Sequence, residues 1–521
     1  MPVNDEHDSI QESAKEQKVE DDSPQSAAEE EPPYTLLSEK EKIIAIVIAS
    51  FSAFLSPVSA SIYFPALNTL ADQLHVSTHE INLSITVYMI CQGLAPSLVG
   101  NYSDIRGRRP ALLLCFLVYI GANIGLALQN SYPALIVLRC LQSSGSSGTI
   151  VISGAVAADL VTRAQRGKYL AYSSMGVTAG QALGPVIGGL LTQYLNVASI
   201  FWFLTAFAGF MAAIVIIFFP ETSRSLVGNG SIPPQKWNRR ILDILRSREW
   251  PSPPESKTMP TTTTNSPPKP RRRPGPLETF KICREKETTI ILLFIGLIFS
   301  GYATILSTLP SQLARKYDFN SLQIGLCCLP YAFGSLTSRW TVGYITDWNF
   351  RRHARHLGIQ IHQNRQTDLA EFPVESARLQ LTLPLVYLSS LFLIIYSWVM
   401  AYKTNLAGPL IMICFTGHAM SGALNTLITL LIDCHVARPA TATAASNLFR
   451  CLIGAGAVAA AEPLISVIGI GWSGTLLASL WVAFSPLLWV VLKFGHAWRR
   501  AAKRKLDNDD DDDDDDATMT S

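Results

Sequence analysis

Apolar stretches separated by short polar segments run along the chain from about residue 43 to residue 495. Each stretch covers roughly 20 residues, which is the length that a helix needs to cross ~30 Å of hydrocarbon. The pattern therefore predicts an all-α membrane protein with twelve transmembrane helices. The expected spans are 43–66, 81–99, 110–129, 133–157, 169–193, 199–219, 288–310, 321–343, 380–402, 409–433, 440–465 and 471–493.

The polar segments divide the chain into five parts. The first is acidic and is expected to be a disordered cytoplasmic tail. Two six-helix halves follow, joined by a cytoplasmic linker rich in Pro, Thr and Arg that we expect to carry at most short helices. The last part is a cytoplasmic acidic tail with an unbroken aspartate run, which we also expect to be disordered. The parts are 1–42, 43–220, 221–287, 288–495 and 496–521, and the run is Asp509 to Asp516.

Charged residues are few and unevenly placed. They make up 16% of the chain, whereas 48% is hydrophobic, and the net charge of +2 does not indicate nucleic-acid binding. Lys and Arg gather in alternate loops, in the linker and after the last span, so both termini are predicted to face the cytoplasm. We expect the plasma membrane as the location, with the vacuolar membrane as an alternative. The basic residues of the two loops in the first half are Arg106, Arg108, Arg109, Arg163, Arg166 and Lys168.

The loop between the second and third spans carries an ordered motif. Its glycines are predicted to let the chain turn at the membrane surface, and its aspartate can accept charge-assisted hydrogen bonds from a basic group or a helix N-terminus. The same spacing begins again six spans later, although Phe350 replaces the second glycine. This repetition indicates two related halves. The first copy comprises Gly100, Asp104, Gly107, Arg108 and Arg109, and the second comprises Gly343, Asp347 and Arg351.

Two arginines lie well inside predicted spans. Arg139 has Gln142 one turn further along its span, and Arg450 has Asn447 one turn before it. A charge inside a membrane is costly, so each arginine is a candidate functional residue. Acidic residues inside spans are scarce, which favours an anionic or neutral substrate over a cation. For Arg450, a structural role in holding helices together is the alternative.

The fifth predicted span contains a glycine-rich string. Glycines four residues apart form a groove that admits a neighbouring helix, and a proline inside the helix removes one backbone hydrogen bond and produces a kink. Gln181 adds a polar side chain to this span and is a candidate lining residue. The glycines and proline of the string are Gly180, Gly184, Pro185, Gly188 and Gly189.

Together, these motifs resemble those of a major facilitator superfamily transporter, and more narrowly those of the fungal twelve-span drug:proton antiporter family. That family includes multidrug exporters and exporters of citrate and related acids, and the resemblance covers roughly residues 43–495. It implies that Asp104 and Arg108 form a cytoplasmic gate and that Arg139 is linked to proton coupling. It also implies that the span-5 string marks an exporter. Ile105 departs from the family pattern, which has a basic residue there.

The leading functional prediction is proton-coupled efflux of a natural product, drug or organic acid by alternating access. Facilitated export of a citrate-like anion without strict proton coupling is the first alternative, and a non-transporting membrane sensor is the second. No nucleotide-binding loop, zinc spacing or nucleophile elbow is present, so we expect neither an enzyme nor a cofactor or metal. The expected partners are a small-molecule substrate, protons and the lipid bilayer, and we expect a monomer.

Overall fold

The structure, a computed structural model, describes residues 35, 37–161, 166–228, 232–235, 238–245, 282–357, 372–435 and 439–519. Within these residues the chain forms helices and no strands. The first half contains α2 (Glu39–Ser61), η1 (Phe64–Ala66), α3 (Leu67–Leu74), α4 (Thr78–Arg106), α5 (Arg108–Leu128), α6 (Tyr132–Leu160), α7 (Arg166–Tyr194) and α8 (Val197–Phe218). The second half contains α12 (Lys286–Tyr317), α13 (Ser321–Cys327), α14 (Leu329–His356), α15 (Val374–Ala401), α16 (Ala407–Cys434) and α17 (Pro439–Met519).

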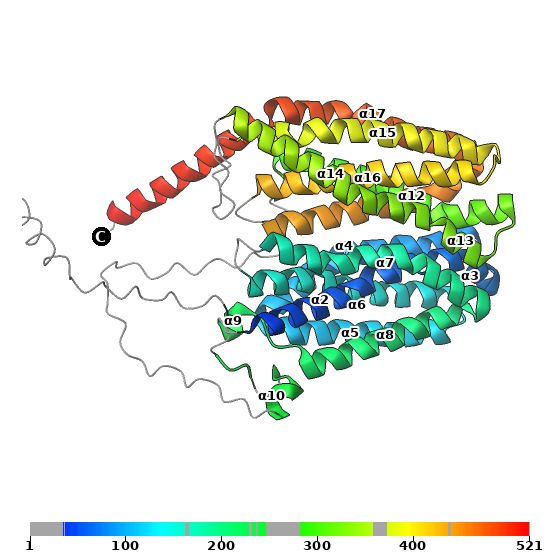
Figure 1. The fold of residues 1–521 in the computed structure, drawn as a ribbon, viewed down its shortest axis with the longest axis horizontal. Helices are drawn as coiled ribbons and strands as arrows, with labels where there is room; N and C mark the ends of the chain where they lie inside the picture. The colour runs from blue at the N-terminus through cyan, green and yellow to red at the C-terminus, as the bar shows by residue number, and fades with distance from the viewer. Residues whose placement is uncertain are drawn as a thin grey trace, which may run out of the picture.

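Long apolar helices confirm the prediction of an all-α membrane protein. In the part of the chain that the structure describes, nine segments are long and apolar enough to cross a membrane. One of them, Thr441–Arg500, has 60 residues and contains a non-helical bend at Gly469, so its length suffices for two crossings. Helices α7 and α14 lie alongside these segments in Figure 1 but are not among the nine. The count of twelve crossings therefore stays a prediction.

The helices gather in two halves that correspond to the sequence halves (Figure 1). In the first half, α2 packs on α6 and α7, and α5 packs on α6 and α8. In the second half, α12 packs on α17, and α15 packs on α16 and α17. The halves meet mainly where α4 contacts α17 and where α7 contacts α13. A site located between the halves would therefore be bordered by helices of both halves.

Capping residues fix where several helices begin. At α4, the backbone N–H of Glu80 donates to Ser77 Oγ at 3.2 Å, and the backbone N–H of Ser77 donates to Glu80 Oε2 at 2.8 Å. This reciprocal pair satisfies two backbone groups that the helix itself leaves without partners. Asn320 and Gln323 form the same arrangement at the start of α13. These caps set the chain turns at the end of the bundle remote from the termini.

The glycine string of α7 lies against α2. A Cβ atom at Gly184 would overlap the Ser61 hydroxyl, and one at Gly188 would overlap the Ile62 carbonyl. Ser61 Oγ also donates to the carbonyl of Gly180 at 3.1 Å. Because no side chain separates the two backbones, α2 and α7 pack in direct contact.

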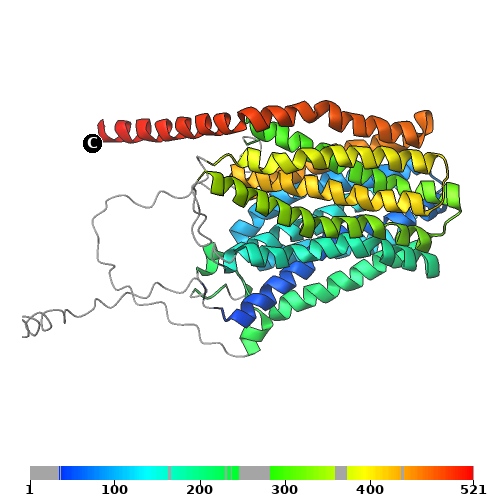
Figure 2. The same cartoon turned by 45° about the horizontal axis from the view of Figure 1, so that its top comes forward.

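The segments outside the bundle differ from expectation in one place. Within the linker, the structure describes the short helices α9 (Arg224–Val227) and α10 (Ile241–Leu245). The acidic run 509–516 belongs to α17, which continues as a helix beyond the bundle (Figure 2), so the prediction of a disordered tail there is wrong. Residues 499–506 are rich in Ala, Lys, Arg and Leu, which are strong helix formers and carry the helix onward. The N-terminal tail up to residue 34 lies outside the described residues.

Candidate functional site

Arg139 lies between two tyrosine rings inside the first half. Its guanidinium carbon is 4.0 Å from the ring centre of Tyr63 and 4.4 Å from that of Tyr88. The side chain is almost completely buried, with 1% of the residue exposed. It forms no ion pair with an acid in the described part of the chain, and its Nε atom has no hydrogen-bond partner there. The ring faces thus supply the negative potential that a carboxylate would otherwise provide.

A chain of amides continues from this arginine. Arg139 Nη1 donates to Gln142 Oε1 at 2.6 Å, and Gln142 Nε2 donates to Asn123 Oδ1 at 2.7 Å. Asn123 in turn donates to the carbonyl of Tyr119 at 2.7 Å. Gln142 and Asn123 are both fully buried, so the network connects α6 to α5 inside the half. In this conformation neither Arg139 nor Gln142 lines a space between the halves.

Arg450 lies at the boundary between the two halves and is partly exposed. Its Nη2 atom donates to Asn447 Oδ1 at 2.7 Å, and Asn447 Nδ2 donates to the carbonyl of Gln92 on α4 at 3.0 Å. Gln92 Nε2 then donates to Ser56 Oγ on α2 at 3.3 Å. The two sequence-predicted residues on α17 are thereby joined to the first half through neutral groups.

Aromatic rings surround the other side of Arg450. Its guanidinium carbon is 4.9 Å from the ring centre of Phe299 on α12. The Phe299 ring centre lies 5.2 Å from that of Tyr302, which lies 5.3 Å from that of Tyr331 on α14. In the described residues no carboxylate forms an ion pair with Arg450. A partly exposed cation beside polar and aromatic groups can bind a small anion that carries an apolar body.

Helix α7 turns one face toward the second half. A Cβ at Gly189 would lie 2.6 Å from the carbonyl oxygen of Ser321, and one at Gly325 would lie 2.5 Å from that of Pro185. Gln181 precedes Pro185 by one helical turn and shares this face, but it is exposed. The α7–α13 contact is therefore close-packed at Gly189 and Pro185, and the exposed Gln181 lies one turn further along α7.

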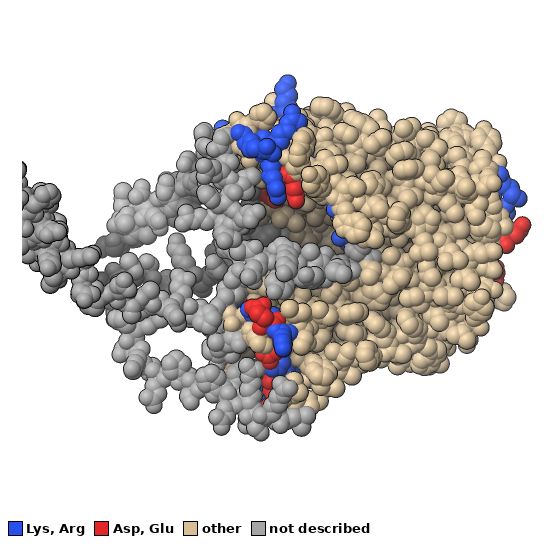
Figure 3. All heavy atoms as spheres, viewed as in Figure 1, with Lys and Arg blue, Asp and Glu red and all other residues tan. Residues whose placement is uncertain are grey.

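The opposite end of the bundle is charged and hollowed. Figure 3 shows acidic and basic side chains gathered at the two ends of the bundle, with an uncharged surface between them. A hollow lies between the halves at the end that carries the chain termini. The hollow thus lies at the end of the bundle opposite the closed α7–α13 contact.

The first loop motif, for which the family resemblance implies a gate role, forms an ion network at this terminal end. Arg108 Nε donates to Asp159 Oδ2 on α6 at 2.9 Å. Arg108 Nη1 donates to Ser103 Oγ at 3.0 Å, and it also donates to the carboxylate of Asp104 on α4. Gly100 lies inside α4 and forms no turn, contrary to expectation, because the helix runs on to Arg106. Gly107 does form the turn, with φ of 110°.

A buried carboxylate holds the other side of this turn. Glu221 accepts the backbone N–H of Arg108 at 2.8 Å and that of Arg109 at 3.2 Å, so it caps the N-terminus of α5. It also accepts the side-chain amide of Asn238 in the linker at 2.9 Å. The buried Arg109 donates to the carbonyl of Ile216 at 3.0 Å. The gate turn is thus fixed to the end of α8 and to the start of the linker.

The second half repeats the network with a different arginine. Arg378 on α15 pairs with Asp433 at 3.1 Å and lies 4.0 Å from Asp347. Arg351, the residue expected from the repeated motif, is exposed and forms no ion pair in the described chain. Gly343 lies inside α14 with open space beside it. The reason is that α14 continues to His356, which places Arg351 beyond the aspartate and away from α15.

Substitution of Arg378 is expected to destabilise the second half. Arg378→Ala leaves the partly buried Asp433 without its cation, which should lower the free energy of unfolding by ~2 kcal/mol, whereas the exposed Asp347 should contribute little. Arg351→Ala removes an exposed side chain and should change it by less than ~0.5 kcal/mol. Thermal unfolding of the two variants in detergent compares them directly. Equal shifts would contradict the assignment of Arg378 to the second gate.

Three residues of these networks escaped the sequence analysis. Asp159 and Arg378 lie in other helices than the loop motifs that they complete, and Glu221 lies just after the end of α8. A weak signal existed for Glu221, because Phe219-Pro220-Glu221-Thr222 directly follows the sixth apolar stretch. For Arg378, the repeated Gly-x3-Asp pattern pointed to the nearest basic residues instead.

Comparisons with known proteins agree with this geometry. A family model described as Major Facilitator Superfamily matches residues 49–459. The chain is 44% identical to MFS-type transporter R5 of a Phoma species, covering 92% of this chain and 90% of the relative. It is 33% identical to Citrate exporter 1 of Aspergillus niger, covering 91% and 90%.

Two solved structures share the fold. The xylose transporter XylE of E. coli, in a partially occluded inward open conformation, superposes with a TM-score of 0.57 at 12% identity, covering 86% of this chain and 98% of the other. The human organic anion transporter MFSD10 superposes with a TM-score of 0.53 at 16% identity, covering 88% and 100%. At these identities the likeness concerns the fold alone.

Proposed function

Because the chain belongs to the Major Facilitator Superfamily and is a multi-pass membrane transporter, we propose that it exports a small organic anion from the cytoplasm. Carboxylates are the leading substrate class. The two halves would rock around a site near the middle of the bilayer, exposing it to each side in turn. We further propose that the protein lies in the plasma membrane with both termini in the cytoplasm.

Arg450 is the observation that carries the substrate class. It is partly exposed between the halves, and in the described chain its partners are an amide and an aromatic ring rather than an acid. A cation in that position attracts an anion strongly, because few polar groups compete and the surroundings have a low dielectric constant. Citrate exporter 1, whose name states an anionic substrate, is a relative over most of the chain.

The conformation supports loading from the cytoplasm. The α7–α13 contact closes the end remote from the termini, whereas the hollow in Figure 3 opens at the terminal end. Gln181 on α7 is exposed, and Arg450 on α17 is partly exposed. Each of these two helices contacts the opposite half. A substrate that enters from the cytoplasm would therefore meet an amide from one half and a cation from the other.

Export is the proposed direction. The span-5 string resembles the antiporter motif of exporters, and in the structure it packs α7 both against α2 and against α13. The string thus links α7, which we propose lines the centre, to the α7–α13 contact that would close the external side. A helix in that place moves when the external side opens, which is the step that releases an exported substrate.

Proton coupling would require a group near the centre of the bundle that binds and releases a proton. The acids of the described spans lie near helix ends, such as Asp159, Asp433 and Glu462, and none of them contacts Arg450. Arginine does not release its proton at accessible pH, so Arg139 would act by positioning its neighbours. This arrangement favours facilitated efflux of an anion as the second candidate function, since facilitated efflux requires no proton carrier.

Efflux from intact cells distinguishes the candidates. Cells that express the protein are loaded with citrate, itaconate or a hydrophobic cationic drug, and release is followed at two external pH values. We expect faster release of a carboxylate than from control cells. An ionophore that exchanges K⁺ for H⁺ removes only the pH gradient, so it should slow a proton antiporter and leave facilitated efflux unchanged. Release of the drug without either carboxylate would overturn the proposed substrate class.

A further inference from the structure

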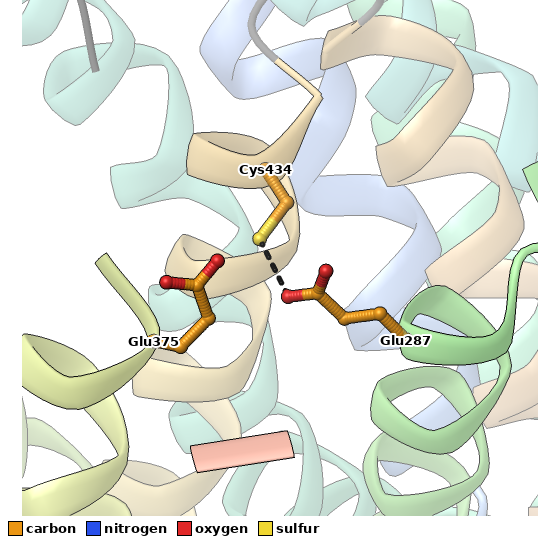
Figure 4. A group of neighbouring side chains, drawn as sticks. All are labelled: Glu287, Glu375 and Cys434. Carbon is orange, nitrogen blue, oxygen red and sulfur yellow. Dashed lines mark hydrogen bonds between the residues drawn. The ribbon is translucent and has the colours of Figure 1, made fainter. Parts of the chain in front are cut away.

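Three potential metal ligands meet at the terminal end of the second half (Figure 4). They are Glu287 at the start of α12, Glu375 at the start of α15 and Cys434 at the end of α16. One ligand atom of each lies within 4.8 Å of the others. The Cys434 thiol donates to Glu287 Oε1 at 3.3 Å. The side chains come from three helices that are distant in sequence, so no sequence spacing motif predicts this cluster.

The charges of this cluster do not balance. Glu375 is 0% exposed and Glu287 is 8% exposed, so both carboxylates are largely removed from water. Arg499 holds Glu375 through two bonds, Nε to Oε1 at 2.8 Å and Nη2 to Oε2 at 3.2 Å. Glu287 forms no ion pair in the described part of the chain, and its hydrogen bond comes from the neutral thiol. Two neighbouring buried carboxylates with one guanidinium favour a further positive charge, which a proton or a metal cation can supply.

Helix α17 leaves room over the same point. A Cβ at Gly495 would lie 3.0 Å from Glu375 Cγ and 3.2 Å from Glu287 Oε1, which is closer than side chains normally pack. The next residue, His496, has its Nδ1 atom 4.0 Å from Glu375 Oε2. The glycine therefore preserves a small space between the carboxylates, and an imidazole stands at its edge.

We propose that Glu287, Glu375 and Cys434 bind a zinc ion. Zinc accepts thiolate, carboxylate and imidazole ligands in a tetrahedron, with bonds of about 2.3 Å to sulfur and about 2.0–2.2 Å to oxygen. Such bonds place the ligand atoms roughly 3.5 Å apart, and the Cys434 to Glu287 distance of 3.3 Å already agrees. Binding releases the thiol proton to solvent. Zinc and Arg499 then balance the thiolate and the two carboxylates.

Arg499 takes the role of a positioning residue in this site. A carboxylate has about four lone pairs, so Glu375 can keep both bonds to Arg499 and still bind a metal. Arg499 also donates to the carbonyl of Phe372 at 2.7 Å, which fixes its own position. Groups that orient a ligand in this way raise metal affinity. Bound zinc would tie α12, α15 and α16 together at one end, a property that does not depend on the transported substrate.

The test is zinc titration of the full chain in detergent, with thermal unfolding as the readout and Mg²⁺ as the comparison ion. For the unchanged protein we expect Zn²⁺, but not Mg²⁺, to raise the unfolding midpoint, with about one zinc per chain after desalting. Loss of an outer-shell partner alone lowers metal affinity 10- to 100-fold, so Cys434→Ser and Glu287→Gln should each lower it by at least ~100-fold. Cys414→Ser on the same helix is the matched control and should behave like the unchanged protein.

The variants keep the proposal falsifiable even where stability changes. Cys434→Ser is nearly isosteric, and Glu287→Gln removes a buried negative charge, so both should fold, which their midpoints without zinc verify. An unchanged protein that shows no zinc response overturns the site. So does a zinc response that persists in both variants. A midpoint that depends on pH alone, and loses that dependence in Glu287→Gln, would make the cluster a proton site instead and overturn the metal.

Discussion

Arg450→Ala is expected to reduce export of the organic anion by at least ~30-fold while the protein remains folded. Removal of one partner of a buried, hydrogen-bonded charge pair costs at least ~2 kcal/mol, and each 1.4 kcal/mol corresponds to a factor of ten. Arg450→Lys keeps the charge but loses the planar fork that bonds Asn447 and stacks on Phe299, so it should retain an intermediate rate. Efflux of labelled carboxylate, normalised to protein in the membrane, measures the effect.

Arg315→Ala provides the matched control for Arg450. Arg315 belongs to the same half, but its side chain is 58% exposed and pairs with Glu462 at 2.9 Å near the end of the bundle remote from the termini. Glu462 is buried, so loss of Arg315 can lower stability. Neither residue contacts Arg450, however, so export normalised to folded protein should stay within about twofold. If both variants lose export equally, the central assignment of Arg450 is wrong. If Arg450→Ala exports normally, the anion site lies elsewhere, and a sensor without transport would show no efflux in any variant.

Arg139→Met is expected to separate folding from transport. Methionine occupies a similar space without a charge, and replacement of a buried charge by an apolar side chain often leaves stability unchanged or higher. The midpoint of thermal unfolding should therefore not fall, whereas export should decrease by at least ~30-fold. The expected loss of export follows from the position of α4. Tyr88 on α4 packs against the Arg139 guanidinium. Gln92, one turn later on α4, contacts Asn447 in the other half. That α4 contact must re-form in every cycle.

Two ring substitutions refine this prediction. Tyr63→Phe keeps the ring face over Arg139 and loses only the hydroxyl bond to Ser84, which measures 3.0 Å, so export should be nearly normal. Tyr63→Leu removes the ring face and should resemble Arg139→Met in export. Normal export by Arg139→Met would show that the arginine has only a structural role. A large fall in its unfolding midpoint would show that the charge supports the fold itself.

The apolar pattern was sufficient to predict the helical membrane fold, because hydrocarbon permits few alternatives for a spanning segment. The repeated loop motif indicated the division into halves. The family resemblance was likewise correct. The two loop motifs were located, and Arg108 pairs with Asp104 beside the turn at Gly107, whereas their role as a gate stays a prediction. Local spacing is enough for such features, since residues within one loop stay close in any packing of the helices.

Contacts between distant helices were not predictable from one sequence. Arg139 seemed a candidate for the central space, yet its two tyrosines come from η1's flank and from α4, which enclose it completely. The partner of Asp347 was sought in the nearby loop, although Arg378 arrives from the next helix. For the linker only short helices were predicted and no contact with the bundle, but Arg240 pairs with Glu41 at 2.8 Å at the start of α2. Each error concerns which faces of helices meet, and that choice depends on packing of the whole bundle.

The closed contact of α7 with α13 has a consequence for how the protein responds to its surroundings. It is made of backbone pressed on backbone, and the described residues place no ion pair across the two halves there. Dispersion forces between such surfaces do not depend on dissolved salt, whereas exposed ion pairs weaken once ionic strength shortens the Debye length to about 8 Å. If that end faces the outside, the stability of the external closure should be the same at low and at high external salt concentration. In the ion networks at the terminal end, the exposed aspartates Asp104 and Asp347 are the members open to screening by salt, and they would then face a cytoplasm whose composition the cell keeps constant.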